Sequence, residues 1–324
     1  MKDDDIEQLL ISAGAREKPP VEIEHEVRDG LRTEWRGIVA EKRRHARRRT
    51  GFALAAGVLA AAVGVWMVAP PSGPAQVVGT LTVAAGDVQL TRGFFDGWQP
   101  IAAGEPLLAG QSLETGSAGR SALTLPGGVS ARMDHDTRLT LASAGEIELE
   151  RGGLYIDAGS RSAVDTRLDV LTPSGSVRHV GTQYEVRLVG SAVRLRVREG
   201  RVEWQSRDGG REQSLAGQQL TIAGDGTVQR QPTPTYGENW NWVAEAAPGI
   251  DIEGLLLADF LNWAGRELGR EIRYDRPETA EEAASIVLHG SISGLMPIDA
   301  LEAVLATTHL RAVVGDGGVI VQGR

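Results

Sequence analysis

Few residues of this chain have the types and the spacing that metal binding or acid–base catalysis requires. Its six histidines are scattered along the sequence without the spacing of metal ligands: His25, His45, His135, His179, His289 and His309. The triplet Asp134-His135-Asp136 does combine side chains that ligate metals. Neighbouring residues of a strand point to opposite faces, however, so three consecutive residues do not converge on one ion. We expect a solvated turn or strand end at 134–136 and predict no metal site.

The residues needed for nucleophilic or nucleotide chemistry are also missing. The chain has no cysteine, which excludes disulfides, thiolate ligands and thiol nucleophiles. It has no G-x-S-x-G elbow, no phosphate-binding P-loop and no dinucleotide-binding glycine pattern. Gly224-Asp225-Gly226 is typical of a hairpin turn. The sequence therefore predicts no catalytic residue, no cofactor and no enzyme activity.

A dense basic run occupies residues 42–49. Its six positive charges are Lys42, Arg43, Arg44, Arg47, Arg48 and Arg49. Such a run attracts phosphate, either of nucleic acid or of lipid headgroups. The next residues, 51–69, carry no charge and are followed by Pro70 and Pro71. As a helix this uncharged run is about 28 Å long, close to the roughly 30 Å hydrocarbon core of a bilayer. We therefore predict a transmembrane helix over 50–69, with the basic run as its topology signal.

The charges on either side of this helix predict its orientation. The cation excess lies before it, and the first positive residue after it is Arg92. Because basic residues mark the cytoplasmic side, residues 1–49 are expected inside the cell and the rest of the chain outside. The basic run begins too far into the chain for a cleaved signal peptide. Interleaved aromatic residues and a DNA-binding fold do not accompany the run, so direct contact with nucleic acid is not expected.

Two short amphipathic helices are predicted within the cytoplasmic segment 1–49. The first, 3–13, begins with aspartates that can cap it and ends before a glycine. In the second, Val27, Leu31 and Trp35 recur at helical spacing. So short a segment buries little surface alone, and this apolar stripe is a candidate site for a cytoplasmic partner. A helical tail packed on itself or on lipid headgroups is the alternative.

Residues 76–230 have the pattern of an all-β domain. Short runs of alternating apolar and polar residues follow one another, as expected for strands with one buried face. Turn signals separate the runs at Gly127-Gly128, Gly152-Gly153, Asp208-Gly209 and Asp225-Gly226. Regular glycines with little long helix favour either a sandwich or a solenoid-like stack of hairpins, and the pattern does not distinguish these two folds.

The C-terminal quarter of the chain has a different pattern. Residues 231–247 are predicted to be a linker in which Trp240 and Trp242 pack as an aromatic anchor against a neighbour. Residues 248–324 are predicted to be a small α+β domain. Its helices are expected over 257–268, ended by Gly269, and from Pro297 onward. Its strands are expected at 271–274 and 286–292 and in a terminal hairpin of 310–314 and 318–321. The whole chain is thus expected to be multi-domain.

The segment 170–202 resembles the central signature of FecR-family proteins, which are membrane-bound regulators of extracytoplasmic-function sigma factors. The matching residues occur in the family's order: Thr172, Pro173, Gly175, Gly181, Thr182, Tyr184, Val186, Glu199 and Gly200. Their types also suit turns, flexible backbone and one face of a strand, so we expect them to be mainly structural. His179 stands where the family commonly has an aspartate.

Residues 248–324 are similar to the short N-terminal domain shared by secretins and TonB-dependent transducers. Together the two resemblances imply a single-pass protein of the bacterial inner membrane whose N-terminus is cytoplasmic and whose folded domains are periplasmic. They imply a sigma factor as cytoplasmic partner and a TonB-dependent transducer or other periplasmic protein as outer partner. We expect this outer contact to be strand addition at an exposed sheet edge.

The cytoplasmic segment departs from the family, because it does not carry the usual tryptophan-centred helical domain. This departure leaves an alternative open. The protein would then be a membrane-anchored structural or ligand-binding protein of the periplasm without sigma-factor activity.

Overall fold

The computed structural model describes residues 76–93, 96–159, 167–315 and 318–324. Residues from Pro74 to Arg324 form one compact unit. The cytoplasmic helices, the basic run and the membrane helix over 50–69 lie outside the described residues. Within the described ranges, no helix is both long and apolar enough to span a bilayer. The membrane helix therefore stays a prediction.

A mostly β part, which we call the β part, covers the described residues up to 232. Its strands form one sheet of 16 strands. They are β1 (Val77–Ala85), β2 (Val88–Thr91), β3 (Gln99–Pro100), β4 (Pro106–Leu108), β5 (Ser112–Thr115), β6 (Arg120–Thr124), β7 (Ser130–Met133), β8 (Arg138–Ser143), β9 (Glu146–Arg151), β10 (Gly153–Asp157), β11 (Asp169–Thr172), β12 (Gly175–Val189), β13 (Ala192–Ser206), β14 (Arg211–Leu215), β15 (Gln218–Ile222) and β16 (Val228–Pro232). The short helix η1 (Pro126–Gly128) connects β6 to β7.

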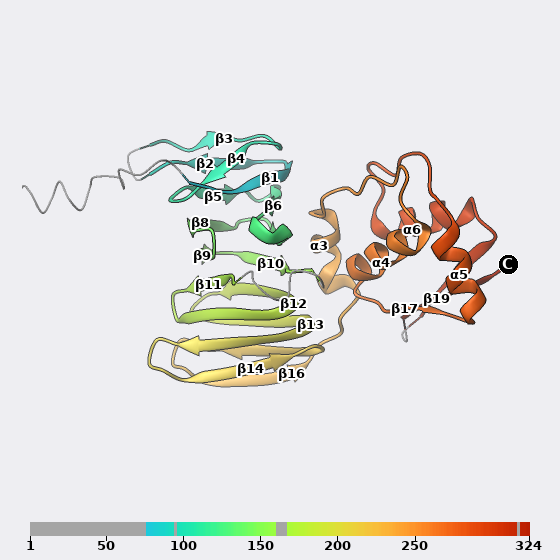
Figure 1. Cartoon of the computed structure of the whole chain (residues 1–324). Coiled ribbons are helices and arrows are strands. Elements are labelled where there is room, and N and C mark those ends of the chain that lie inside the picture. Colours follow the sequence, from blue (N-terminus) through green and yellow to red (C-terminus); the bar gives the residue numbers. More distant parts are fainter. Residues whose placement is uncertain (1–75, 94–95, 160–166, 316–317) are drawn as a thin grey trace, which may run out of the picture. The chain divides into compact units, whose positions relative to one another are not determined.

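The sheet has two arms that are joined by long strands. In one arm β2, β5, β8, β9 and β11 follow one another, and in the other β10, β7, β6, β1 and β4 do. Strand β12 belongs to both, because its residues 175–178 pair with β11 and its residues 183–187 pair with β10. Figure 1 shows the strands stacked in layers from β2 down to β16. The mostly β class predicted for 76–230 is confirmed, and the strands form one sheet and not the two separate sheets of a sandwich.

The long strands bend where Gly181 of β12 lies beside Gly200 of β13. Both glycines have positive φ, 57° and 75°, a conformation that residues with a side chain rarely adopt. The pairing of β12 with β13 shifts register between Val180 and Gln183. A Cβ atom on Gly200 would lie 2.5 Å from the carbonyl oxygen of Gly181. Glycine at both positions thus allows the two strands to pass from one arm to the other.

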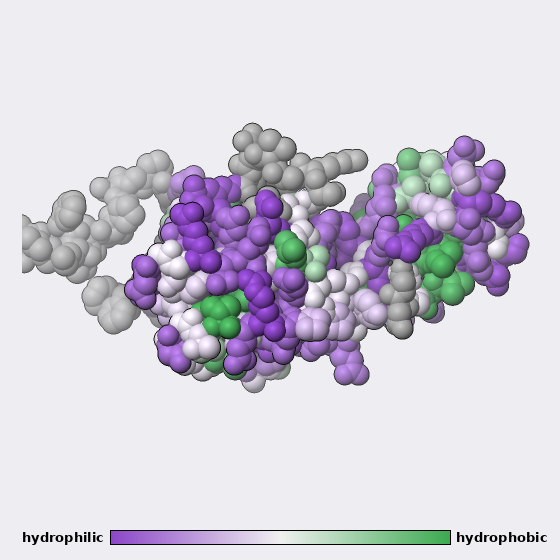
Figure 2. All heavy atoms as spheres, turned by 90° about the horizontal axis from the view of Figure 1, so that it is seen from below, coloured by the Kyte–Doolittle hydropathy of each residue, from purple (hydrophilic) through white to green (hydrophobic). Residues whose placement is uncertain are grey.

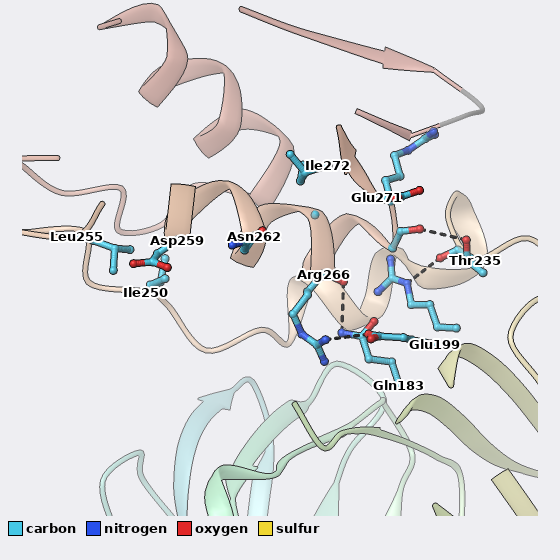
Figure 3. Close-up of a pocket in the computed structure, with 14 residues that line it drawn as sticks. Gln183, Glu199, Thr235, Ile250, Leu255, Asp259, Asn262, Arg266, Glu271 and Ile272 are labelled. Atoms are coloured by element: carbon cyan, nitrogen blue, oxygen red, sulfur yellow. Dashed lines mark hydrogen bonds and ion pairs between the residues drawn. The ribbon is translucent and has the colours of Figure 1, made fainter. Parts of the chain in front are cut away.

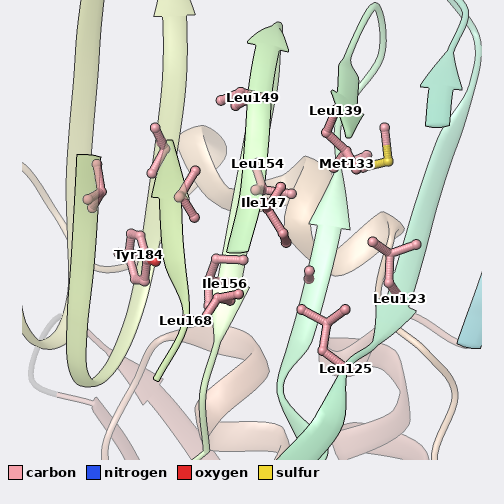
Figure 4. Close-up of a cluster of buried hydrophobic side chains, with 14 of the residues drawn as sticks. Leu123, Leu125, Met133, Leu139, Ile147, Leu149, Leu154, Ile156, Leu168 and Tyr184 are labelled. Atoms are coloured by element: carbon pink, nitrogen blue, oxygen red, sulfur yellow. The ribbon is translucent and has the colours of Figure 1, made fainter. Parts of the chain in front are cut away.

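The apolar core of the β part lies between the two arms. Alternate residues of facing strands, such as Leu139 and Leu141 of β8 and Leu154 and Ile156 of β10, have 0% exposure. Figure 4 shows Leu139, Leu154 and Ile156 gathered between the strands, with Tyr184 from β12 among them. Each buried aliphatic side chain stabilises the fold by roughly 1.5–3 kcal/mol relative to an exposed one. The period-two patterning of the sequence therefore produces this core.

The remainder, which we call the C-terminal part, is α+β. Its elements are η2 (Glu238–Trp240), α3 (Asn241–Glu245), α4 (Leu257–Leu268), β17 (Ile272–Tyr274), α5 (Pro277–Ser285), α6 (Pro297–Ala306), β18 (Leu310–Gly315) and β19 (Gly318–Gly323). The three strands form their own sheet in the order β17-β19-β18. Residues of α4 and α6 and the inner face of this sheet share a core that is separate from that of the β part.

Most predicted elements of the C-terminal part are present. Helix α4 ends at Gly269, whose φ of 62° is the left-handed cap that the sequence indicates. Helix α6 begins at Pro297, and β18 and β19 form the terminal hairpin.

Two predictions for the C-terminal part were wrong. Helix α5 was missed, because its sequence buries only Thr279 and Ala283 and so shows no apolar stripe. The strand expected at 286–292 is absent, and only Val287 forms an isolated bridge, with Leu256. Main-chain hydrogen bonds of this segment go to the loop before α4, where the amide of Leu288 donates to the carbonyl oxygen of Leu255 at 2.8 Å.

Candidate protein interface

The strand that buries Tyr184 and Val186 turns its alternate side chains to the outer face. These are Gln183, Glu185 and Arg187 of β12. Although they are polar, Gln183 and Glu185 are only 2% and 1% exposed. The amide of Gln183 lies 3.5 Å from the carbonyl oxygen of Arg266 in α4. The outer face of β12 is therefore part of a contact with the C-terminal part, which we call the junction.

A buried ion pair between Arg132 of β7 and Glu267 of α4 lies in the junction. Both terminal nitrogens of Arg132 donate to the Glu267 carboxylate at 2.7 Å, and one also donates to the carbonyl oxygen of Val243 at 2.9 Å. The two residues are 2% and 6% exposed. Burial by itself would lower the pKa of Arg132, but the facing carboxylate raises it above its ordinary value. The guanidinium therefore stays charged, and loss of either partner would leave a buried charge unpaired.

A second ionic contact is made by Arg266, the preceding residue of α4. Its guanidinium donates to Asp157 of β10 and, at 2.8 Å, to Glu199 of β13. Burial lowers the pKa of Arg266, while Asp157 and Glu199 raise it above its ordinary value. The amide of Gln183 also donates to Asp157, at 2.8 Å. Residues of three adjacent strands thus hold one side of α4.

Aromatic residues fill the part of the junction next to the ion pairs. Trp240, Trp242 and Val243 form a buried cluster with Tyr155 of β10. The ring centroids of the two tryptophans lie 6.1 and 6.4 Å from that of Tyr155, in edge-to-face arrangements. The indole nitrogen of Trp240 donates to the carbonyl oxygen of Pro234 at 2.8 Å. The aromatic anchor predicted within 231–247 is therefore confirmed.

The Asp134-His135-Asp136 triplet is a turn, but only part of it is solvated. The side chains of His135 and Asp136 are 48% and 63% exposed, whereas that of Asp134 is only 4% exposed. Asp134 accepts hydrogen bonds from Arg187 at 2.5 Å and from Arg120 at 3.1 Å. Burial raises the pKa of Asp134, but these two arginines hold it below its usual value. In the described part of the chain, no three carboxylates or histidines are grouped so that they could hold a metal ion.

A cleft of about 990 Å³ opens beside α4. Gln183, Arg198 and Glu199 of the β part line it, together with Asn262, Arg266 and Ile272 of the C-terminal part. In Figure 3, Arg266 points from α4 toward Glu199 and Gln183 across this cleft. No histidine is among the lining residues. The arrangement can bind by charge and hydrogen bonding, and it does not present a nucleophile with an adjacent base.

The structure divides the signature residues among four places: the turn into β12, the bend, the core and the junction. Thr172 and Pro173 begin the turn into β12, where the Thr172 hydroxyl donates to the carbonyl oxygen of Gly175 at 2.7 Å. Gly181 and Gly200 lie at the bend. Tyr184 and Val186 are in the core.

Thr182 is buried beside the bend, and Glu199 is in the junction through Arg266. The candidate partner-binding residues Val27, Leu31 and Trp35, and the basic flank, lie outside the described residues.

Sequence reasoning singled out Trp240, Trp242 and Glu199 but missed the other residues of the junction. Gln183 and Glu185 had a signal, because they alternate with the inward-facing Tyr184 and lie on the opposite face of the strand. Arg132 and Glu267 had none, because their pairing spans 135 positions of the chain. Only the fold brings these two side chains together.

Comparison with known proteins gives one family match. Residues 111–203 match the family model described as FecR protein. This range contains the signature from Thr172 to Gly200 and also the junction residues Arg132, Asp157 and Gln183. No curated protein gives a significant match to the chain.

Two solved structures are similar to the chain. They are crystal structures, at 2.50 Å and 1.65 Å resolution, of a protein from Parabacteroides distasonis that is provisionally assigned as an anti-sigma factor. Each is 15% identical to this chain and covers 66% of it. The similarity covers 98% and 99% of those chains, with TM-scores of 0.34 and 0.35.

Proposed function

The chain contains a FecR-family domain at residues 111–203, and from this premise we propose that the protein is a membrane-anchored regulator of a sigma factor. The order of segments in the sequence supports this proposal. The family domain follows an uncharged run of bilayer length, 51–69, which itself follows the basic run 42–49. A sensor outside the cell and an effector segment inside it would have this order.

On the cytoplasmic side we place a sigma factor on residues 1–49. The apolar stripe of Val27, Leu31 and Trp35 suits a helix laid in a groove of a partner, because its residues recur at helical spacing. On the outer side, a periplasmic protein such as a TonB-dependent transducer contacts the folded domains. Protein contacts of this kind use main-chain groups and surface shape, and they need no catalytic residue.

Co-purification of the full chain with its cognate sigma factor from membranes tests this function. We expect Trp35→Ala and Leu31→Asp to lose the sigma factor, and Thr33→Ala, on the opposite face of the predicted helix, to keep it. Retention by all three variants would show that the stripe does not bind the sigma factor. Absence of any sigma factor from the wild-type complex, with the chain inserted in the membrane, would refute the regulatory role.

Reporter fusions test the proposed topology. An alkaline phosphatase fused after residue 75 is expected to be active, since that enzyme needs an oxidising compartment, and a fusion after residue 49 is expected to be inactive. Substitution of the six basic residues of 42–49 by glutamine should reduce this difference. Equal activity of the two fusions would refute a single crossing over 50–69.

The cleft beside α4 favours a second candidate function, that of a membrane-anchored ligand-binding or structural protein of the periplasm. Its lining combines Arg198 and Arg266 with apolar side chains such as Ile250 and Ile272, which suits an anionic ligand with an apolar portion. A sigma-dependent reporter that is unchanged by deletion of the chain would favour this second function.

A further inference from the structure

Strand β18 is an exposed, apolar edge of the C-terminal sheet. It lies at the end of the order β17-β19-β18, so one side of it has no neighbouring strand among the described residues. Val313 and Val314 of β18 and Ile320 of β19 are 49%, 41% and 44% exposed. Figure 2 shows hydrophobic atoms exposed on the C-terminal part, at the right of the view. Edges of this kind pair with other strands unless charge, proline or a bulge prevents it.

The register of the hairpin shows which main-chain groups of β18 are free. The amide of Arg324 donates to the carbonyl oxygen of His309 at 2.9 Å, so 309 and 324 form a hydrogen-bonded pair. Hydrogen-bonded and non-hydrogen-bonded pairs alternate along an antiparallel ladder. In this register Arg311 and Val313 direct their main-chain groups to β19. Ala312 and Val314 therefore direct theirs to the open side, where they offer two donors and two acceptors.

Arg311 is the charged side chain of this strand, whereas Arg273 of β17 is paired with Glu271 at 2.5 Å. Val313 lies opposite Ile320, and Arg273 of β17 lies on the far side of Ile320. Arg311 is the nearest outward-facing neighbour of Val313 on the same strand. An added strand must therefore place an apolar residue against Val313 and avoid a cation against Arg311.

We propose that the strand added to β18 is β18 of a second copy of this chain, antiparallel and related by a two-fold axis at Val313. In this register Ala312 pairs with Val314 of the second copy, and Val314 pairs with Ala312 of the second copy. Each pair makes two main-chain hydrogen bonds, so there are four in all. Val313 lies directly opposite Val313 of the second copy. Arg311 lies opposite Gly315, which has no side chain, so no two cations face each other.

Neighbouring registers leave more main-chain groups of β18 without a hydrogen bond or bring like charges together. A register centred on Ala312 would pair Val314 with Leu310, but the amide of Leu310 already donates to the hydroxyl of Thr308 at 3.1 Å. A register centred on Arg311 would place two arginines directly opposite each other, which is destabilising. Of these three registers, the one centred on Val313 makes the edge most complementary to itself.

The absence of cysteine from the chain allows a direct test of this contact. Val313→Cys introduces a single thiol in a non-hydrogen-bonded pair, where opposed Cα atoms are about 4.5 Å apart, within the range of disulfides. In membranes that contain the full chain, mild oxidation is expected to convert most of this variant to a disulfide-linked dimer. Val189→Cys, at a site that is 52% exposed and far along the chain, controls for random collision and should give several-fold less dimer.

A proline variant tests whether the edge itself is responsible. Val314→Pro removes an amide that faces the open side and leaves the β18–β19 ladder intact, because proline is tolerated at such edge positions. The double variant Val313→Cys, Val314→Pro should lose the dimer while its thermal unfolding stays close to that of Val313→Cys. Arg311→Cys, which faces Gly315, should cross-link several-fold less than Val313→Cys.

Three outcomes would overturn the proposal. They are a Val313→Cys dimer no more abundant than that of Val189→Cys, a dimer that survives Val314→Pro, and a cross-link of Val313→Cys to a different protein in place of the dimer. The last result would assign the edge to strand addition by another partner.

Discussion

The two faces of strands β12 and β13 differ in chemistry although they alternate residue by residue. On the inner face Tyr184, Val186 and Leu195 are all at 0% exposure in an apolar core. On the outer face Glu185, Arg187 and Arg196 are charged, and Arg187 lies 2.7 Å from the Glu185 carboxylate. The inner face stabilises the β part by removing apolar surface from water, whereas the outer face is a charged surface on which the C-terminal part docks.

This difference indicates separate roles for the two faces. Apolar burial is non-directional and scales with area, so the core sets the stability of the fold. A buried ion pair adds little net stability but is costly to break, so it selects one docking geometry. We infer that the junction specifies the position of α4 and that the core maintains the sheet.

Loss of Glu267 should have the largest effect. Glu267→Ala leaves the buried Arg132 unpaired, and we expect the docked state to lose about 3–5 kcal/mol. Hydrogen exchange of α4 and proteolysis within 231–247 should both increase. The double variant Arg132→Met, Glu267→Leu removes both charges and should restore most of the protection. Equal exchange in wild type and Glu267→Ala would show that the pair does not hold the junction.

Adjacent residues of β13 allow the core to be compared with the outer face. Leu195→Ala should lower the free energy of unfolding of the β part by about 2–5 kcal/mol, because it creates a cavity in the core. Arg196→Ala, one residue away on the outer face, should lower the free energy of unfolding by much less. Urea denaturation of the two variants measures the difference. Similar losses for both would mean that the faces do not have separate roles.

The bend between the arms should be sensitive to a single methyl group. Gly200→Ala places a Cβ atom 2.5 Å from the carbonyl oxygen of Gly181, in addition to the strain of its positive φ. We expect a loss of about 1–3 kcal/mol from backbone strain, plus the cost of relieving this overlap. Gly190→Ala is the matched control, because its φ is 59° and nothing lies within 4 Å of the added atom. The difference between the thermal midpoints of the two variants measures the cost of the overlap with Gly181. Equal midpoints would show that this overlap costs nothing.

The smallest expected effect is a dependence on pH through Asp134. The pKa of this carboxyl is lowered in the folded protein by Arg187 and Arg120, against the effect of burial. A lowered pKa contributes stability above the unfolded value of about 3.9, and this contribution is lost as the pH falls through the folded value. Wild type should therefore exceed Asp134→Asn in stability at neutral pH, and the gap should close in acid below the unfolded pKa. A gap between wild type and Asp134→Asn that is constant with pH would contradict the assignment.

Much of the fold follows from local patterns in the sequence. The alternation around Tyr184 predicts a strand, and the turns at Asp208-Gly209 and Asp225-Gly226 predict hairpins that the structure has. Gly269 correctly marks the end of α4. These features depend on neighbouring residues, which the sequence shows directly. The hairpin expected at Gly152-Gly153 was wrong, because the strands that it joins, β9 and β10, do not pair with each other.

The aromatic anchor of the junction was predicted, but its ion pairs could not be, because they join residues that are distant in the sequence. Arg132 and Glu267 meet only after the two arms have formed and α4 has docked on one of them. Helix α5 was missed for a related reason, because its few buried residues are defined by contacts with other elements and show no stripe of their own. Local sequence patterns therefore predict the strands and most helices, whereas the ionic contacts of the interface depend on tertiary structure.

The ion pair of Arg132 with Glu267 also has a mechanical consequence. The C-terminal part is tied to the β part covalently through the chain that follows β16, and non-covalently through this pair, the contacts of Arg266 and the aromatic anchor. Arg132 belongs to β7, which is separated from β1 only by β6. A load applied to the C-terminal part can therefore reach the first strand of the sheet across three adjacent strands, rather than along the whole intervening chain.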